Sequence, residues 1–245
     1  MVRITTLASS HLLSSRLYSA SELAVGSLLL LGLGSLLPTL TVTALNWGLA
    51  FGTYAFISLC VLIFWSGGAL GWANRITLLR AVLVALVAGA LADNVFTHAI
   101  WLWLVTATTA LMLDGVDGWI ARKTQSYSTF GARFDMELDA LLILLLCVGL
   151  IQLESLGLWV LLIGVTRYLF VVASWHFTWL SAPLFASRRR KVVCVWQVSA
   201  LLLALTPLTP TLVASLLAFS ALLSLAYSFG IDTWWLYQQR RRQAL

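Results

Sequence analysis

Long apolar runs alternate with short polar segments along the 245 residues of this chain. An α-helix needs about 20 predominantly apolar residues to cross a bilayer. The pattern therefore predicts an all-α fold, a polytopic membrane helix bundle with about eight transmembrane helices and no soluble domain. The predicted spans are Leu23–Leu40, Thr43–Trp65, Ile76–Leu91, Ala99–Leu113, Ala140–Leu153, Leu158–Leu180, Val192–Leu205 and Thr211–Phe229. We expect the fourth, fifth and seventh helices to continue into the polar segments beside them.

Composition supports the same class. Hydrophobic residues make up 61% of the chain and charged residues only 10%, which excludes an ordinary soluble domain. The 12 Trp residues suit the membrane interfaces. The three cysteines, Cys60, Cys147 and Cys194, lack the spacing of a metal site and are too few for a disulfide framework. We interpret them as small core hydrophobes.

Basic residues lie on one side of the predicted bundle. With eight spans, the loops on the opposite side contain no Lys or Arg, and the one exception to the pattern is Arg167, in the middle of the sixth span. This asymmetry predicts that both termini are cytoplasmic. The net charge of +6 favours contact with anionic lipid headgroups or an anionic substrate over nucleic acid, because the basic groups are short clusters at helix ends. The clusters are Arg3/Arg16, Arg75/Arg80, Arg122/Lys123/Arg133, Arg188–Lys191 and Arg240–Arg242.

The segment Met1–Ser21 is rich in Ser, contains Arg3 and Arg16, and has no acidic residue. It faintly resembles a transit peptide. A short tail on the positively charged side of the membrane fits the charge pattern better. We expect the protein to reside in a cell membrane, the inner membrane of a bacterium, with its site on the cytoplasmic side.

Five of the nine acidic residues fall between Leu113 and Ala140, with apolar spans on both sides. Asp114 and Asp117 are three residues apart, and Asp135 and Asp139 are four apart, so each pair shares one helix face. Two helices joined by a short connection would aim all four carboxylates at one point. Such a cluster next to a bilayer needs compensation, and a hard divalent cation, Mg²⁺ or Mn²⁺, provides it. A solvated helix end is the alternative.

Neighbouring residues add features of phosphoryl transfer. Gly115 and Gly118 leave the first helix without side chains beside its carboxylates, so a bulky ligand can approach closely. Arg122 follows one turn later and suits a phosphate oxygen. Gly131 lies one turn before Asp135. A carboxylate not committed to metal could deprotonate an attacking hydroxyl, and Asp139 is the candidate because it lies deepest along its helix.

These residues reproduce a known signature. The chain matches every fixed position of D-x2-D-G-x2-A-R-x8-G-x3-D-x3-D, and so resembles the CDP-alcohol phosphotransferases, also called CDP-alcohol phosphatidyltransferases. The matching positions are Asp114, Asp117, Gly118, Ala121, Arg122, Gly131, Asp135 and Asp139. Upstream, the segment from Ala73 to Arg80 resembles the family's P-N-x-I-T-x-x-R, with Ala73 in place of the proline.

The resemblance implies an integral-membrane enzyme that moves a substituted phosphate from a CDP-linked donor, usually CDP-diacylglycerol, to an alcohol and releases CMP. It implies two metal ions on Asp114, Asp117 and Asp135, with Asp139 as general base and further metal ligand. Residues 71–245 would form a six-helix core, 1–70 a tail with two extra helices, and the protein a homodimer. Implied contacts with the nucleotide or donor are Asn74, Thr77, Gly118, Ala121, Arg122 and Gly131.

Other charged residues are open to two interpretations. Arg133 and Arg167 could bind an anionic acceptor such as a phosphorylated polyol, or could form internal ion pairs. Glu137 lies off the Asp135/Asp139 face, and we expect it to be solvated or paired with an Arg. The run Arg188–Lys191 has the character of a headgroup-binding patch.

Two other functions compete. A transporter or cation channel would use buried acids to coordinate a moving ion, but such proteins often show paired repeats, and this chain has one acidic cluster. An inactive family member would have lost a motif aspartate, and none is lost. The sequence therefore favours the enzyme and leaves its acceptor alcohol open.

Overall fold

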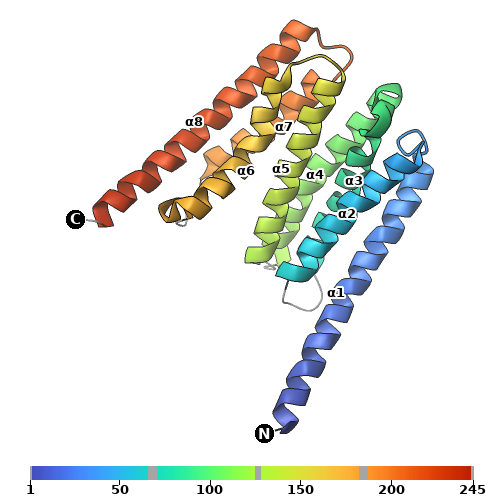
Figure 1. The fold of residues 1–245 in the computed structure, drawn as a ribbon, viewed down its shortest axis with the longest axis vertical. Helices are drawn as coiled ribbons and strands as arrows, with labels where there is room; N and C mark the ends of the chain where they lie inside the picture. The colour runs from blue at the N-terminus through green and yellow to red at the C-terminus, as the bar shows by residue number, and fades with distance from the viewer. Residues whose placement is uncertain (1, 66–70, 125–127, 182–186, 244–245) are drawn as a thin grey trace. The chain divides into compact units, whose positions relative to one another are not determined.

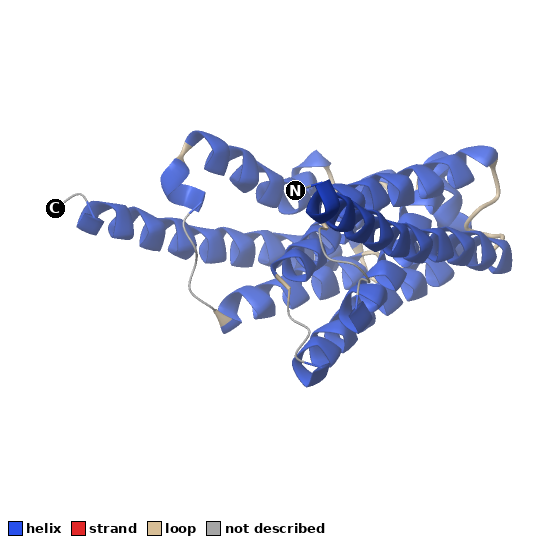
Figure 2. Ribbon diagram, turned by 90° about the horizontal axis from the view of Figure 1, so that it is seen from below, coloured by secondary structure: helices blue, strands red, loops and turns tan. Residues whose placement is uncertain are grey.

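The chain is almost entirely helical in a computed structural model that describes residues 2–65, 71–124, 128–181 and 187–243 (Figures 1 and 2). The described part contains no strand, and each of the eight predicted spans overlaps one α-helix, which confirms the predicted fold class. Within these ranges, side chains are not described for residues 2–17 and for Ala73, Asp117, Trp119, Ala121, Arg122, Thr124, Thr129, Thr178, Ser181, Arg242 and Gln243.

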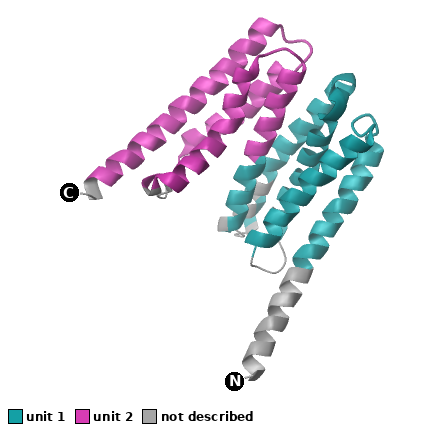
Figure 3. Ribbon diagram, viewed as in Figure 1, with its two compact units in different colours: residues 1–138 teal, residues 139–245 magenta. Residues whose placement is uncertain are grey.

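The helices fall into two compact units, Met1–Leu138 and Asp139–Leu245 (Figure 3). The first contains α1 (Val2–Leu36), α2 (Ala44–Phe64), α3 (Gly71–Ala90), the 3-10 helix η1 (Ala92–Ala99) and α4 (Ile100–Thr124). Helix α5 (Thr129–Gln152) runs through the boundary between the units. The second unit continues with η2 (Leu158–Val160), α6 (Leu161–His176), η3 (Thr178–Ser181), α7 (Arg188–Ala204) and α8 (Thr211–Gln243).

Five helical stretches in the described part are long and apolar enough to cross a membrane. The remaining helices, α3, α5 and α7, are interrupted by charged residues: Arg75 and Arg80 in α3, four charged residues in α5, and four basic residues at the start of the 17-residue α7. As expected, α4, α5 and α7 extend into the polar segments. The five stretches are Tyr18–Leu36, Ala44–Phe64, Ala92–Val116, Leu158–His176 and Thr211–Arg241.

Several boundaries differ from the prediction. Helices α1 and α3 begin earlier, at Val2 and Gly71 instead of Leu23 and Ile76. Helix α1 ends at Leu36, because Pro38 cannot continue the helix and disfavours helical backbone at the residue before it. Helix α6 ends at His176, and its predicted continuation is the short 3-10 helix η3. Helix α8 continues to Gln243, well past the apolar run.

Helix α3 is the most buried element of the first unit. Every residue from Arg80 to Leu91 is buried, and α3 packs against α1, α2 and α4. Gly89 permits the close approach of α2, because a Cβ at this position would lie 2.7 Å from the carbonyl oxygen of Asn46 and 2.8 Å from Cβ of Ala50. The Asn46 side-chain amide donates to the Gly89 carbonyl at 2.9 Å. The two α3 residues that the sequence assigned to donor binding, Asn74 and Thr77, are therefore held on a tightly packed helix.

The two N-terminal helices also contact the beginnings of helices α3 and α5. Glu22 on α1 forms a 2.6 Å ion pair with Arg75, next to Asn74 on α3. Trp65, which ends α2, packs against Phe130 at the start of α5 with ring centroids 5.3 Å apart. Helices α1 and α2 thus support the two segments that the sequence assigned to donor binding.

In the second unit, the basic run at the start of α7 has an acidic partner that the sequence analysis did not identify. Asp232 on α8 is 4% exposed and forms an ion pair with Arg189, and its second oxygen lies 4.0 Å from Arg190. The run is therefore more than a headgroup-binding patch, because two of its arginines connect α7 to α8.

The α2–α3 contact gives a first prediction. Gly89→Ala should lower the free energy of unfolding by about 1–3 kcal/mol, because the new methyl group overpacks a site bounded by backbone. Thermal unfolding of the detergent-solubilised protein measures this change. Gly48→Ala on α2 is the control, since a Cβ there meets nothing within 4 Å. Equal melting temperatures for the two variants would contradict the close packing.

Candidate active site

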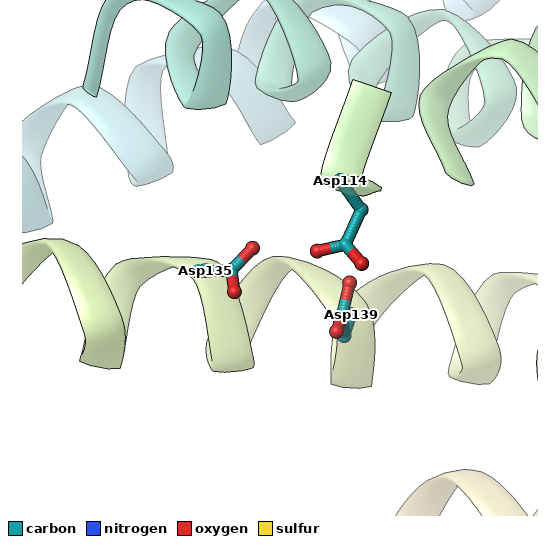
Figure 4. Close-up of side chains that lie close together, drawn as sticks. All are labelled: Asp114, Asp135 and Asp139. Atoms are coloured by element: carbon teal, nitrogen blue, oxygen red, sulfur yellow. The ribbon is translucent and has the colours of Figure 1, made fainter. Parts of the chain in front are cut away.

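Three aspartate carboxylates come together in the described part of the chain. Asp114 lies on α4, and Asp135 and Asp139 lie one turn apart on α5. One carboxylate oxygen of each lies within 4.8 Å of the others, and Figure 4 shows the three side chains turned toward the same space. All three are partly buried. The predicted convergence of the two helix faces is therefore present for these three residues.

The ligand chemistry of this cluster fits a divalent cation. Carboxylate oxygens are the ligands that Mg²⁺ and Mn²⁺ favour in proteins. Three carboxylates this close repel one another unless a cation compensates them. The side chain of Asp117, the fourth aspartate of the motif, lies outside the described residues, as do those of Ala121 and Arg122. Their assignment to the metal and the nucleotide stays a prediction.

Arg80 is the site residue that the sequence analysis missed. Arg80 is 1% exposed. Its Nη1 contacts Oδ1 of Asp135 and lies 3.1 Å from Oδ1 of Asp114. Its Nε donates to the carbonyl oxygen of Ala110 at 3.2 Å. The sequence analysis grouped it with Arg75 as a basic helix end and matched it to the last residue of the P-N-x-I-T-x-x-R segment, but gave it no role at the site. A signal was available, because Arg80 follows Asn74 and Thr77 at steps of three residues, which places all three on one helix face.

Three of the residues assigned to the donor lie on α3 or against it: Asn74, Thr77 and Gly131. Asn74 and Thr77 are 6% and 3% exposed. A Cβ on Gly131 would lie 2.6 Å from Oδ1 of Asn74 and 2.8 Å from Oγ of Ser128, so only glycine fits there without displacing the amide. The Gly131 N–H donates to the Ser128 hydroxyl at 2.8 Å. The signature glycine and the upstream asparagine are thus in direct contact. Gly118 is partly buried on α4.

Cys194 makes a polar contact that its interpretation as a core hydrophobe did not include. The residue is only partly buried, and its thiol donates to Oδ2 of Asp139 at 3.5 Å. By contrast, Cys147 is fully buried, as expected of a core residue. Nothing in the sequence connected α7 to Asp139, because this contact joins residues 55 positions apart.

The remaining assignments receive less support from the structure. Arg133 and Glu137 are exposed on α5. Arg167 is partly buried in the middle of α6, as its position in an apolar span suggested. None of the three belongs to the carboxylate cluster, and their contribution to an acceptor site stays a prediction.

The family comparison agrees with this geometry. The model of the CDP-alcohol phosphatidyltransferase family matches residues 70–231, more than half of the chain. The chain belongs to this family. It is thus an integral membrane enzyme of the CDP-alcohol phosphotransferase type, which transfers a phosphate-linked group from a CDP-alcohol. Comparison with curated proteins and with solved structures gives no significant match.

The carboxylate cluster predicts stabilisation by metal. Mn²⁺ at 100 times its dissociation constant should stabilise the protein by about 2.7 kcal/mol, and EDTA should reverse the effect. Asp135→Asn should reduce this stabilisation, because the cluster loses a charged ligand. Melting temperatures with and without Mn²⁺ measure it. Glu154→Gln, an exposed position outside the cluster, should keep the full shift, and a full shift in Asp135→Asn would exclude this residue as a ligand.

Proposed function

We propose that the protein transfers a phosphatidyl group from a CDP-linked lipid, such as CDP-diacylglycerol, to the hydroxyl of an alcohol and releases CMP. The observation that carries this proposal is the cluster of Asp114, Asp135 and Asp139 inside a CDP-alcohol phosphatidyltransferase domain. The lipid donor is supported by the apolar helices, since a membrane-embedded enzyme takes lipid substrates from the bilayer around it.

The proposed reaction is a displacement at the phosphorus that carries the lipid. The acceptor oxygen forms the new P–O bond, the P–O bond to CMP breaks, and CMP leaves with the electron pair. Asp139 accepts the proton of the attacking hydroxyl. One or two divalent cations, Mg²⁺ or Mn²⁺, would be held by Asp114, Asp135 and Asp139, with Asp117 as the fourth ligand, and would neutralise the pyrophosphate and the departing CMP.

The other assigned residues bind and orient the donor. Asn74, Thr77 and Gly131 lie together in the first unit, where Gly131 leaves room for the Asn74 amide. We assign Gly118, Ala121 and Arg122 to the nucleotide, with Arg122 on a phosphate oxygen. This constellation would hold the reacting phosphorus in place while an alcohol approaches Asp139.

We also propose a cellular setting. The loops on one side of the predicted spans hold no Lys or Arg, which supports cytoplasmic termini and a site that opens to the cytoplasm. We assign the enzyme to the inner membrane of a bacterium. The product would then be a phospholipid. We further propose that residues 71–245 form the catalytic core, that 1–70 add a supporting pair of helices, and that the enzyme acts as a homodimer.

The general base is tested by Asp139→Asn. Purified enzyme with Mn²⁺ and CDP-diacylglycerol should release CMP when given its acceptor, and the variant should lose turnover by about 10²- to 10⁴-fold. Nucleotide binding should remain largely intact. Glu137→Gln on the same helix, an exposed position, is the control and should keep near wild-type turnover. Full activity of Asp139→Asn would refute the assignment of the base.

The acceptor class is tested by a CMP-release screen of glycerol 3-phosphate, inositol phosphate, inositol and serine. We expect a phosphorylated acceptor, with Arg133 or Arg167 binding its phosphate. Replacing Arg167 with Gln should raise KM for that acceptor roughly 10- to 100-fold, the equivalent of one charge-assisted hydrogen bond. Arg240→Gln at the C-terminal end of α8 should have little effect. Activity only with unphosphorylated alcohols would contradict the assignment.

A further inference from the structure

We propose that Arg80 is a positioning residue of the metal centre, a fixed cation that holds the carboxylates of Asp114 and Asp135 in the orientation that binds metal. This inference rests on the proposed metal-dependent function. It adds a residue of α3 to a centre whose ligands all come from α4 and α5.

The contacts of Arg80 fix the guanidinium in three directions. Its Nη1 reaches Oδ1 of both aspartates, which come from different helices. Its Nε donates to the backbone of Ala110, one turn before Asp114 on α4. Because the guanidinium is planar, these contacts together determine where its plane lies. The carboxylates that bind it are restrained in turn.

Burial makes this arrangement stable. The side chain of Arg80 is 2% exposed, whereas those of Asp114 and Asp135 are 26% and 34% exposed. The arginine is therefore enclosed while the carboxylates keep open surface for a further partner. A buried guanidinium stays charged, and the carboxylates compensate that charge. Separating Arg80 from them would therefore carry a large free-energy cost.

Arg80 could instead compete with metal, as an internal cation that a bound ion must displace. The structure favours the positioning role for two reasons. Arg80 lies within the buried part of α3, where its neighbour Ala81 is 0% exposed, so the side chain has no solvent to move into. Each carboxylate also has a second oxygen besides the Oδ1 that Arg80 contacts, and one carboxylate can accept from an arginine while it binds a metal.

The experiment measures Mn²⁺ binding to the detergent-solubilised full-length protein by electron paramagnetic resonance, without substrate. Arg80→Gln should weaken Mn²⁺ binding about 10- to 100-fold, the usual effect of losing a group that orients a metal ligand. Arg80→Lys keeps the charge but lacks the planar fork, and its affinity should fall between those of wild type and Arg80→Gln. Gel filtration and melting without metal show that each variant is folded.

Arg75→Gln is the matched control. It removes the same charge from the same helix and breaks the ion pair with Glu22, and it should leave Mn²⁺ affinity unchanged. If it weakens Mn²⁺ binding as much as Arg80→Gln does, a general loss of positive charge or of α3 packing explains the effect, and the proposal is wrong.

The other outcomes separate this proposal from the proposed function. Wild-type Mn²⁺ affinity in folded Arg80→Gln would overturn the positioning role and leave the metal-dependent transferase intact. Tighter binding would also overturn it, because Arg80 would then be a competitor. Absence of Mn²⁺ binding in the wild type would overturn the metal centre itself and this role with it. If Arg80→Gln does not fold, Arg80→Lys decides by the same comparison with Arg75→Gln.

Discussion

The site depends on the compensation of clustered carboxylate charge inside a mostly apolar helix bundle. Arg80 connects α3 to Asp114 on α4 and Asp135 on α5, so one guanidinium links three helices. Removing the carboxylates would leave the buried guanidinium uncompensated, and an unpaired buried charge of this kind costs up to about 3–5 kcal/mol. In our proposal, the same interaction that links the three helices also prepares the carboxylates for a divalent cation.

The packing of the first unit protects this arrangement. Helix α3 lies against α1, α2 and α4, and Gly89 lets α2 come close to the C-terminal end of α3. At the N-terminal end of α3, Glu22 pairs with Arg75, and Gly131 of α5 lies against the Asn74 amide. A helix packed this tightly has little freedom to shift. The N-terminal helices, for which the sequence suggested no role, thus contribute rigidity to the segment that we assign to donor binding.

Hydrophobic runs were sufficient to predict the helices, and residue spacing to predict which face of α5 carries Asp135 and Asp139. Both depend on local periodicity, which a single sequence contains. The side chains from other helices that contact these aspartates were not predictable in the same way. Arg80 was grouped with the exposed Arg75 because both are basic and lie on one predicted side, although only Arg80 shares the face of Asn74 and Thr77. The contact of Cys194 with Asp139 joins two helices, and no periodicity within one helix indicates its neighbour.

For the basic run at the start of α7, too, the sequence did not indicate the partner on another helix, and the structure identifies it. The sequence suggested one common role for four consecutive cations, but successive residues of a helix point in different directions. Arg189 and Arg190 turn toward the buried Asp232 and are partly enclosed, whereas Arg188 and Lys191, three residues apart, are exposed. The run therefore divides by helix face. Two arginines hold α7 against α8 through an otherwise costly buried acid, and the other two remain available to anionic headgroups or to an anionic substrate.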